Sequence, residues 1–387
     1  MREFRIGSGR VIPVLLLLLG GLSACDGAPD TAVPSALDVD AVVTLQNRLD
    51  EARRQADVPG MGAVISRSSG LVAHAVSGQR RIDHGANIEP DDAFHIGSVT
   101  KTMTGMLAAQ AVETGQLGWD TRLLDVFPEF RDNALPDYEG LTLAHLLSHE
   151  SGLPQLIEDD RIAVLPAFTG SLQEQRQALV GWMLLQPPVG EAGASYHYSN
   201  GGFTAAAAMI ERRTGTSWEQ AIKDQIASPL GMQHVGLGWP GTGAGAEGFV
   251  FGHRRENGQW RPVDPDGDYQ IAALLNPAGA LHASMSDMGI YGASWLQAML
   301  GQSESISQAT VDAMLEPRFQ GGISWGVQRG FGHEQAVVYV GSAGTFVCFI
   351  VLIPEGDLAV TVVMNGTDDS SDRAAVRLLQ TLIDDFS

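Results

Sequence analysis

Segments typical of β-strands occur near both ends of the chain, and the long stretch between them is typical of helices and loops. Residues 61–66 and 71–77 are apolar, and a Ser-Ser-Gly turn signal separates them. Four further apolar, β-branched segments follow late in the chain, at residues 323–327, 336–340, 345–353 and 358–364. This order predicts an α/β fold of the α+β type: an antiparallel sheet formed by both chain ends and flanked by helices, with an inserted mainly helical region.

The helical patterns define the expected domain organisation. An amphipathic pattern begins at Asp38 and ends before Pro59-Gly60, and another begins near Ser371. We therefore expect one domain over residues 38–387. Its sheet part would comprise residues 38–95 and 305–387, and its helical part residues 96–304. The expected helices of the middle region are 98–114, 143–149, 173–185, 202–214, 218–227 and 285–300.

The N-terminus has the features of a targeting segment. Arg2, Arg5 and Arg10 precede an apolar stretch over residues 11–22, which is shorter than the roughly 20 residues of a membrane span. The stretch ends in small residues before Cys25, as in a bacterial lipoprotein signal. We expect residues 1–24 to be a lipoprotein signal peptide, Cys25 to carry the lipid, and residues 25–37 to form a tether.

This interpretation places the protein outside the cytoplasm, in the periplasm or at the cell surface, as a membrane-anchored lipoprotein. An ordinary signal peptide with a chance cysteine is the alternative. Cys348, the other cysteine, lies within an apolar run, so we expect a buried strand residue rather than a nucleophile.

The charge of the chain limits its partners. The sequence has 45 acidic and 24 basic side chains, a formal net charge of −21. Binding to nucleic acid requires clustered Lys and Arg that neutralise phosphates, so we expect no nucleic-acid partner. The charge does not indicate the oligomeric state.

One tetrapeptide has a spacing suited to nucleophilic catalysis. In Ser98-Val99-Thr100-Lys101, the serine and the lysine are three residues apart at the start of a predicted helix, so they share one face. The helix N-terminus favours a developing oxyanion, and a partly buried Lys101 would lose its proton and act as a base. On its own, the pattern is weak evidence for catalysis, and a helix cap with a solvated lysine is the better explanation of it.

A second candidate is Tyr198-Ser199-Asn200. A tyrosine near a cationic lysine can relay a proton, and an asparagine can hold a substrate carbonyl or the lysine itself. A surface turn is the alternative interpretation of this tripeptide.

Read together and in order, these segments resemble the serine β-lactamase and penicillin-binding-protein superfamily. The branch that the chain resembles is the class C-like group of β-lactamases, D-alanyl peptidases and family VIII-type esterases. The segments that carry the resemblance, from Val58 to Asn365, are Ser98–Lys101, Leu146–Pro154, Tyr198–Asn200, Ser228–Met232 and Asn276–Leu281.

The resemblance implies a role for each matching residue. Ser98 would be the acylated nucleophile and Lys101 its base or proton shuttle. Tyr198 would be the second proton-transfer residue, and Asn200 would bind substrate or anchor Lys101. The backbone N–H of Ser98 would form half of the oxyanion hole.

The third motif of the family departs from its usual form. It is normally Lys-Thr-Gly or His-x-Gly on a strand, and the best placement here is Tyr339-Val340-Gly341 followed by Ser342. Gly341 would allow close approach of the substrate, and the N–H of Ser342 would complete the oxyanion hole. Tyr339 replaces the cation that helps to hold a substrate carboxylate. His333 and Arg329 are the other candidates for that cation.

Two patterns resemble metal sites, but structural explanations fit both better. His145 and His149 are four residues apart, within the stretch that the family resemblance covers. Asp264, Asp266 and Asp268 resemble the start of a calcium loop that lacks its closing glutamate. We expect no metal and no cofactor.

The sequence thus predicts an extracytoplasmic serine hydrolase that forms an acyl-enzyme with an ester, a β-lactam or a peptide ending in D-Ala. The expected partners are a small-molecule or peptidoglycan-type substrate and, through the lipid, a membrane. A non-catalytic binding or scaffold protein that retains the fold is the alternative.

Overall fold

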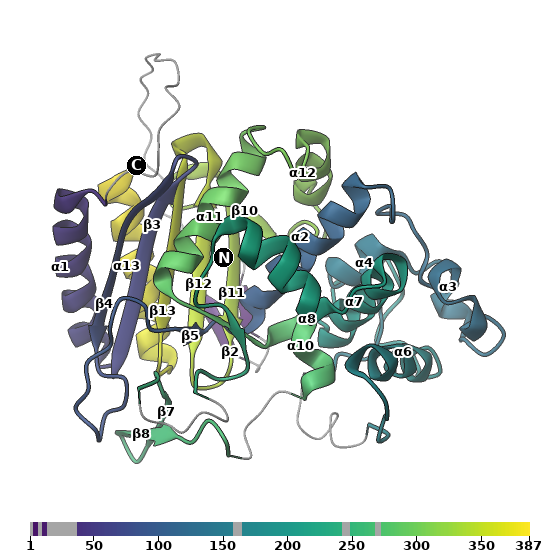
Figure 1. Ribbon diagram of the computed structural model, residues 1–387, viewed down its shortest axis with the longest axis horizontal. Helices are drawn as coiled ribbons and strands as arrows, with labels where there is room; N and C mark the ends of the chain where they lie inside the picture. The colour runs from purple at the N-terminus through teal and green to yellow at the C-terminus, as the bar shows by residue number, and fades with distance from the viewer. Residues whose placement is uncertain (1–2, 7–9, 14–36, 158–164, 242–247, 268–271) are drawn as a thin grey trace.

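The computed structural model describes residues 3–6, 10–13, 37–157, 165–241, 248–267 and 272–387 (Figure 1). Cys25, Asp268 and most of the expected signal segment and tether lie outside these residues. Two short strands, β1 (Glu3–Ile6) and β2 (Arg10–Pro13), pair as an antiparallel hairpin. No helix within the described ranges is long and apolar enough to cross a membrane.

A six-stranded antiparallel sheet joins the two ends of the chain, which confirms the predicted fold class. Its strand order is β10-β11-β12-β13-β3-β4, and β13 pairs directly with β3, with Val362 opposite Ala63. The C-terminal strands are therefore completed by the first hairpin of the domain. The bounds are β3 (Gly60–Arg67), β4 (Gly70–Gly78), β10 (Gly326–Gly330), β11 (His333–Ser342), β12 (Val347–Ile353) and β13 (Leu358–Met364).

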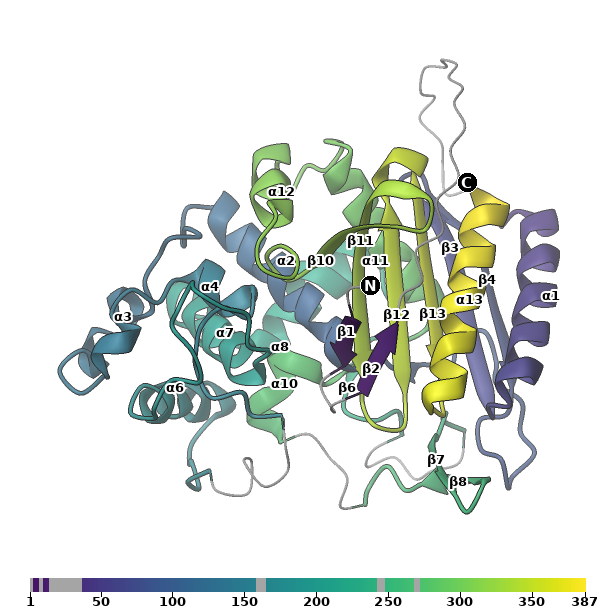
Figure 2. The same ribbon diagram turned by 180° about the vertical axis from the view of Figure 1, so that it is seen from behind.

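Helices cover both faces of this sheet (Figures 1 and 2). α1 (Val39–Ala56) and α13 (Asp369–Phe386) pack on one face, and α11 (Met285–Met299) packs on the other. Side chains of β12 alternate between the two resulting cores because successive residues of a strand point to opposite faces. Cys348 is fully buried on the α11 side, as the sequence predicted. The sequence pattern places the residues of α11 in the helical part of the domain, whereas in the structure this helix packs against the sheet.

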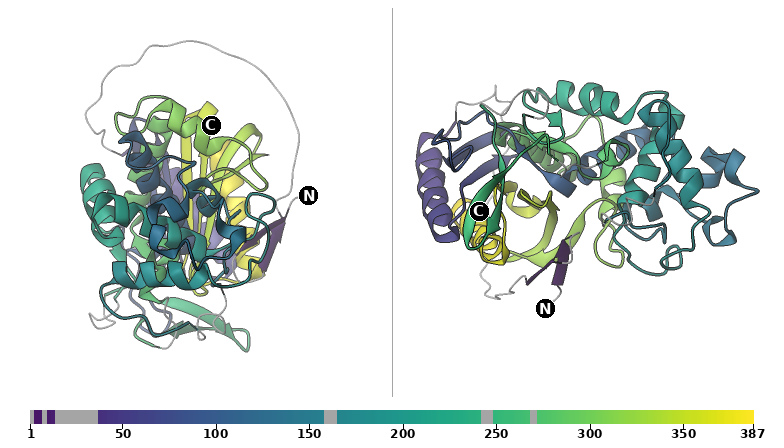
Figure 3. Two further views of the ribbon diagram at one scale, coloured as in Figure 1. Left: turned by 90° about the vertical axis from the view of Figure 1, so that its right-hand side faces the viewer. Right: turned by 90° about the horizontal axis from the view of Figure 1, so that it is seen from below.

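The rest of the middle region lies beside the sheet and carries most of the short helices (Figure 3). Its α-helices are α2 (Thr100–Glu113), α3 (Leu123–Val126), α4 (Leu143–Leu147), α6 (Leu172–Met183), α7 (Asn200–Thr214), α8 (Trp218–Ala221), α9 (Ser228–Leu230) and α10 (Asn276–Gly279). α12 (Gln308–Leu315) follows the middle region and packs against α11 and α2. A π-helical turn, η4 (Ile222–Ala227), joins α8 to α9. The 3-10 helices are η1 (Gly97–Val99), η2 (Pro128–Phe130), η3 (Pro136–Tyr138), η5 (Ala273–Leu275) and η6 (Pro354–Gly356).

Two small sheets complete the fold. β5 (Phe94–His95), β9 (Leu281–Ala283) and β6 (Gly236–Leu237) form one, and β7 (Gly252–Glu256) with β8 (Gln259–Val263) forms the other. β5 leads directly into η1, and η1 contacts β11 of the large sheet. This contact holds the start of α2 against the end of β11, the strand next to the edge strand β10.

The expected strand over residues 323–327 is largely wrong. Residues 321–325 form a turn before β10, in which Ser324 has a φ of 62°. Ile323 and Trp325 are buried in the core that the helical region shares with the sheet. Tertiary packing therefore accounts for apolar residues that the sequence pattern assigned to a strand.

Candidate active site

Ser98 lies where η1 passes into α2, beside the sheet. Its side chain is partly exposed, whereas Lys101, one turn further along, is 0% exposed. Gly97 adopts a φ of 52°, and its N–H donates to Nδ1 of His95 at 3.0 Å. The left-handed conformation at Gly97 turns the chain so that the serine stands at the start of the helix.

The amine of Lys101 is surrounded by three oxygen atoms. Nζ lies 3.1 Å from Oγ of Ser98, 2.8 Å from Oδ1 of Asn200 and 2.5 Å from the carbonyl oxygen of Ala278. The amide of Asn200 is oriented because its Nδ2 donates to the carbonyl of Leu156 at 2.9 Å. Oδ1 of Asn200 therefore faces the lysine.

Burial lowers the pKa of Lys101 well below its usual value. A neutral amine has two N–H donors and one lone pair. The carbonyl oxygens of Asn200 and Ala278 can only accept, so they take the two donors. The lone pair then faces the hydroxyl of Ser98, which is the arrangement that a base requires.

Tyr198 approaches the same hydroxyl from the other side. Its phenol donates to Oγ of Ser98 at 2.7 Å, and burial raises its pKa to about 12. Ser199 caps α7 by accepting from the N–H of Gly202 at 3.0 Å, so Tyr198 stands just before the helix and Asn200 begins it. At neutral pH the phenol is protonated, and it can give a proton to a leaving group.

His149 packs its ring against that of Tyr198 and helps to position it, a role that the sequence did not indicate. The two rings stack with centroids 4.3 Å apart, and Nδ1 of His149 accepts from the N–H of Ser199 at 3.0 Å. This bond places the imidazole proton on Nε2, which lies 3.4 Å from the phenol oxygen of Tyr339. Burial lowers the pKa of His149 well below its usual value, so the ring is neutral.

The two histidines that resembled a metal pair have separate roles. Nδ1 of His145 accepts from the N–H of Thr142 at the start of its own helix, whereas His149 binds Ser199. Within the part of the chain that the structure describes, no group of three His, Cys, Asp or Glu side chains is placed to hold a metal ion.

The end of β11 packs tightly against the serine turn. A Cβ atom at Gly341 would lie 2.7 Å from the backbone nitrogen of Ser98 and 2.1 Å from the carbonyl oxygen of Ile96. A Cβ atom at Gly97 would lie 2.7–2.8 Å from backbone atoms of Ser342. The backbone of Ser342 therefore lies beside that of the nucleophile turn, as the predicted oxyanion hole requires. β10 pairs with β11 only as far as Val338, so the segment from Tyr339 to Ser342 faces the site.

The structure excludes the two alternative cations. His333 begins β11, six residues or about 20 Å of strand from Tyr339, and its Nδ1 pairs with Glu355 at 2.7 Å. Arg329 forms an ion pair with the exposed Glu334. Neither reaches Ser98, so the residue that stands at the cation's position in β11 is Tyr339.

The carbonyl of Ala278 is a second feature that the sequence did not reveal. It belongs to α10, which is fixed because Oγ1 of Thr104 donates to the carbonyl of Pro277 at 2.7 Å. The segment was part of the family resemblance, but every residue has a backbone carbonyl, so the residue type at this position does not reveal the contact. The structure shows that this turn supplies one of the three contacts of Lys101.

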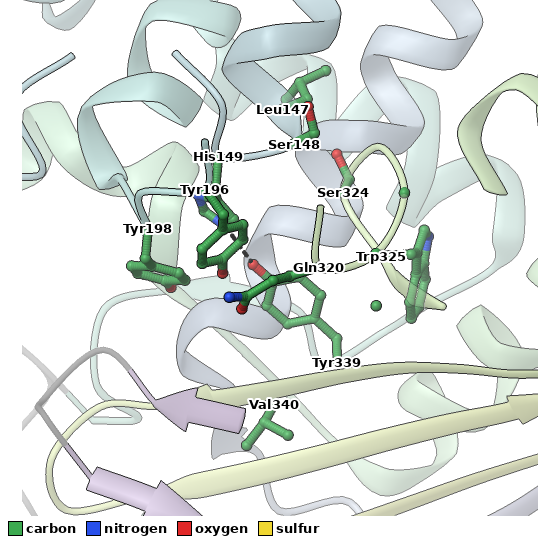
Figure 4. Close-up of a pocket in the computed structure, with 13 residues that line it drawn as sticks. Leu147, Ser148, His149, Tyr196, Tyr198, Gln320, Ser324, Trp325, Tyr339 and Val340 are labelled. Atoms are coloured by element: carbon green, nitrogen blue, oxygen red, sulfur yellow. Dashed lines mark hydrogen bonds between the residues drawn. The ribbon is translucent and has the colours of Figure 1, made fainter. Parts of the chain in front are cut away.

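A small cavity of about 50 Å³ lies beside Tyr198 (Figure 4). Its walls come from the end of α4 and the loop after it, the segment before α7, residues 320–326 and the end of β11. Tyr196, Tyr198, Tyr339, His149, Gln320 and Trp325 are among the lining residues. The site is thus open to a small group next to its proton-transfer tyrosine.

Comparison with known proteins places the chain in a family. The family model described as Beta-lactamase matches residues 45–384. Among curated relatives, "Penicillin-binding protein 4" of Amycolatopsis lactamdurans is 30% identical over 48% of this chain and 47% of its own length. "Esterase EstB" of Burkholderia gladioli is 29% identical over 59% of each chain. The matches thus span about half or slightly more of each of these relatives' lengths.

Solved structures share the fold over most of the chain. A penicillin-binding protein homologue from Pyrococcus abyssi superposes with a TM-score of 0.71 and 26% identity, covering 89% of this chain and 77% of its own. A class C beta-lactamase has a TM-score of 0.69 at 18% identity, covering 89% of this chain and 99% of its own. These structures show that the fold is shared, and the family match over residues 45–384 shows that the chain belongs to the beta-lactamase family.

Proposed function

We propose that this protein hydrolyses carboxylic esters outside the cytoplasm through an acyl-enzyme on Ser98. The observation that carries the proposal is the position of Oγ of Ser98, 3.1 Å from the amine of Lys101 and 2.7 Å from the phenol of Tyr198. One of these groups is suited to take a proton and the other to give one. The partial exposure of Ser98 allows an acyl donor to reach it.

In the proposed acylation step, the neutral Lys101 takes the hydroxyl proton as Oγ of Ser98 attacks the ester carbonyl. The N–H groups of Ser98 and Ser342 hold the oxyanion of the tetrahedral intermediate. When the carbon–oxygen bond breaks, Tyr198 gives its proton to the leaving alkoxide. The proton held by Lys101 then restores the phenol, so both groups return to their starting states. Water releases the acyl group by the same transfers in reverse order.

Tyr339 supports an ester substrate over one that carries a carboxylate. A phenol donates a single hydrogen bond, whereas a lysine or arginine also neutralises charge. Burial raises the pKa of Tyr339 well above its usual value, so the side chain is neutral. "Esterase EstB" is among the relatives, which agrees with this preference.

Hydrolysis of β-lactams or of peptides ending in D-Ala is the second candidate. It is favoured by relatives named "Penicillin-binding protein 4" and, from Escherichia coli, "Beta-lactamase", which is 25% identical over 64% of this chain. The third candidate is a non-catalytic binding protein. The fully buried amine of Lys101 beside Ser98 argues against it.

Parallel kinetics with nitrocefin and short-chain p-nitrophenyl esters separate these candidates. The proposal predicts that ester turnover, compared as kcat/KM, exceeds nitrocefin turnover, and that Ser98→Ala abolishes it. A higher kcat/KM for nitrocefin would favour the second candidate. No turnover of either substrate, together with no acylation of Ser98, would favour the binding protein.

The proposed location rests on the N-terminal sequence. Arg2, Arg5 and Arg10 before the apolar stretch, followed by Cys25, support export and a lipid anchor. Expressed in a bacterial host, the wild type should fractionate with membranes, and a lipid should be detectable on Cys25 by mass spectrometry. The Cys25→Ala variant should lose both properties. Membrane association without lipid in either protein would contradict the anchor.

A further inference from the structure

The polar groups that line the cavity beside Tyr198 are neutral. Burial raises the pKa values of Tyr196, Tyr198 and Tyr339, and it lowers that of His149. Gln320 adds an uncharged amide at the rim, beside the ring of Tyr339 (Figure 4). These groups offer hydrogen bonds without compensating the charge of a ligand.

The charged residues next to this loop are already paired. Arg318 lies two residues before Gln320, and its guanidinium donates to Glu150 at 2.8 Å. The side chain of Glu150 is 3% exposed and that of Arg318 is 29% exposed, so the carboxylate of this pair is the buried partner. Recruiting this guanidinium to a ligand would leave a buried carboxylate unpaired, which is strongly unfavourable.

The position of the cavity identifies the part of the substrate that reaches it. The oxyanion would face the N–H groups at the junction of η1 and β11, around Ser98 and Ser342. The leaving oxygen must lie near its proton donor, the phenol of Tyr198. Because Tyr198 and Tyr339 also line the cavity, the group attached to the leaving oxygen is the part directed toward it.

The size of the cavity limits that group. The volume is about 50 Å³. A bound water needs about 10–15 Å³ on this measure, so the cavity has room for roughly four non-hydrogen atoms. Trp325 and Val340 supply apolar surface between the polar groups, which suits a short alkyl chain.

We propose that this cavity, with Gln320 at its rim, is the alcohol subsite of the enzyme and accepts a short uncharged alkoxy group. The assignment rests on the proposed ester hydrolysis and adds the class of alcohol that is released. A carboxylate or an ammonium group on the alcohol would lose its hydration there without gaining a counter-charge.

Three butyrate esters test the proposal with the full protein: ethyl butyrate, the butyrate ester of glycolic acid, and isobutyl butyrate, whose uncharged alcohol group matches the glycolate group in size. Each kcat/KM is divided by the rate constant of hydroxide-catalysed hydrolysis, which removes the intrinsic reactivity of the leaving group. In this ratio, the ethyl and isobutyl esters should each exceed the glycolate ester by about tenfold or more. Equal ratios for the three esters would overturn the alcohol subsite but leave ester hydrolysis standing. Absence of turnover for all three would overturn the proposed function and the subsite with it.

A substitution that adds a charge at Gln320, at the rim of the cavity, provides a second and independent test. Gln320→Lys should raise the kcat/KM of the glycolate ester relative to the ethyl ester, and relative to the isobutyl ester, by about tenfold. Gln335→Lys, at another exposed position near the far end of β11, is the matched control for net charge and should change neither ratio. The same response from both variants, or no response from Gln320→Lys, would overturn the assignment of Gln320 to the subsite.

Discussion

The amine of Lys101 lies 3.1 Å from the hydroxyl oxygen of Ser98, with its two other contacts made to carbonyl oxygens that can only accept. No carboxylate is among these three contacts. Burial therefore lowers the lysine pKa without an opposing ion pair, and once the amine has lost its proton, the position left for its lone pair is toward the serine. The burial of Lys101 and its three contacts thus explain both why its pKa is lowered and why its amine is placed to take the proton of Ser98.

The first prediction concerns the dependence of activity on pH. Burial lowers the pKa of Lys101 well below its usual value, so the amine stays neutral to a lower pH than a free lysine does, and it takes up a proton as the pH falls through its folded-state pKa. The log of kcat/KM should therefore fall with a slope of about one on the acid side. A pH–rate profile on a neutral p-nitrophenyl ester measures this. Activity that instead rose on acidification would contradict a neutral lysine base.

Replacing Lys101 should remove that base. Lys101→Met keeps most of the side-chain volume, and we expect kcat to fall by about a hundredfold or more, because proton transfer by a positioned group contributes that much. The circular dichroism spectrum should stay unchanged. Residual turnover close to that of the wild type would show that another group takes the serine proton.

Tyr198→Phe tests the proton donor. The variant retains the stacked contact with His149 but lacks the phenol oxygen that lies 2.7 Å from Oγ of Ser98. We expect kcat/KM for ethyl esters to fall by about a hundredfold. The loss should be smaller for p-nitrophenyl esters, whose leaving group needs less protonation. An equal loss for both ester types would argue against the role of Tyr198 as the acid.

Gly341→Ala tests the contact between β11 and the serine turn. The new methyl group would meet backbone atoms of Ile96 and Ser98, which cannot yield as a side chain can. We expect a loss of about 1–3 kcal/mol in the free energy of unfolding from overpacking, with a large loss of activity. Gly330→Ala in the neighbouring strand is the control, since its Cβ would lie 3.4 Å from the end of the Gln328 side chain. Equal effects of the two substitutions would contradict the close approach at Gly341.

A buried ion cluster away from Ser98 gives a prediction on stability alone. Arg176 is 0% exposed and binds both Glu211, at 2.5 Å, and Glu219, at 2.8 Å. Arg176→Met should reduce the free energy of unfolding by about 3–5 kcal/mol, because it leaves two partners without their cation. Arg212→Ala, which breaks an exposed pair with Glu129, should change it by at most about 1 kcal/mol. Chemical denaturation of both variants measures the difference.

The sequence predicted the parts of the fold that have a regular pattern. Apolar strand segments at both chain ends predicted a sheet that joins them, and the order of Ser98, Lys101, Tyr198 and Asn200 predicted which side chains meet. It did not predict the turn at Ser324, because buried apolar residues look alike in a turn and in a strand.

The remaining features of the site depend on tertiary contacts. The carbonyl of Ala278 reaches Lys101 only because α10 packs against α2, and any residue type supplies a carbonyl. His149 has a φ of 60° and binds Ser199, 50 residues later in the chain. Periodicity and local spacing carry no information on such contacts.

The central claim is that Ser98 is the acylated nucleophile and that Lys101 activates it. Mass spectrometry of the protein after exposure to a fluorophosphonate measures this most directly, with the modified peptide sequenced. We predict one adduct, located on Ser98, which forms in the wild type, is absent in Ser98→Ala and forms far more slowly in Lys101→Met. An adduct on another residue, or equal rates in the wild type and Lys101→Met, would contradict the account.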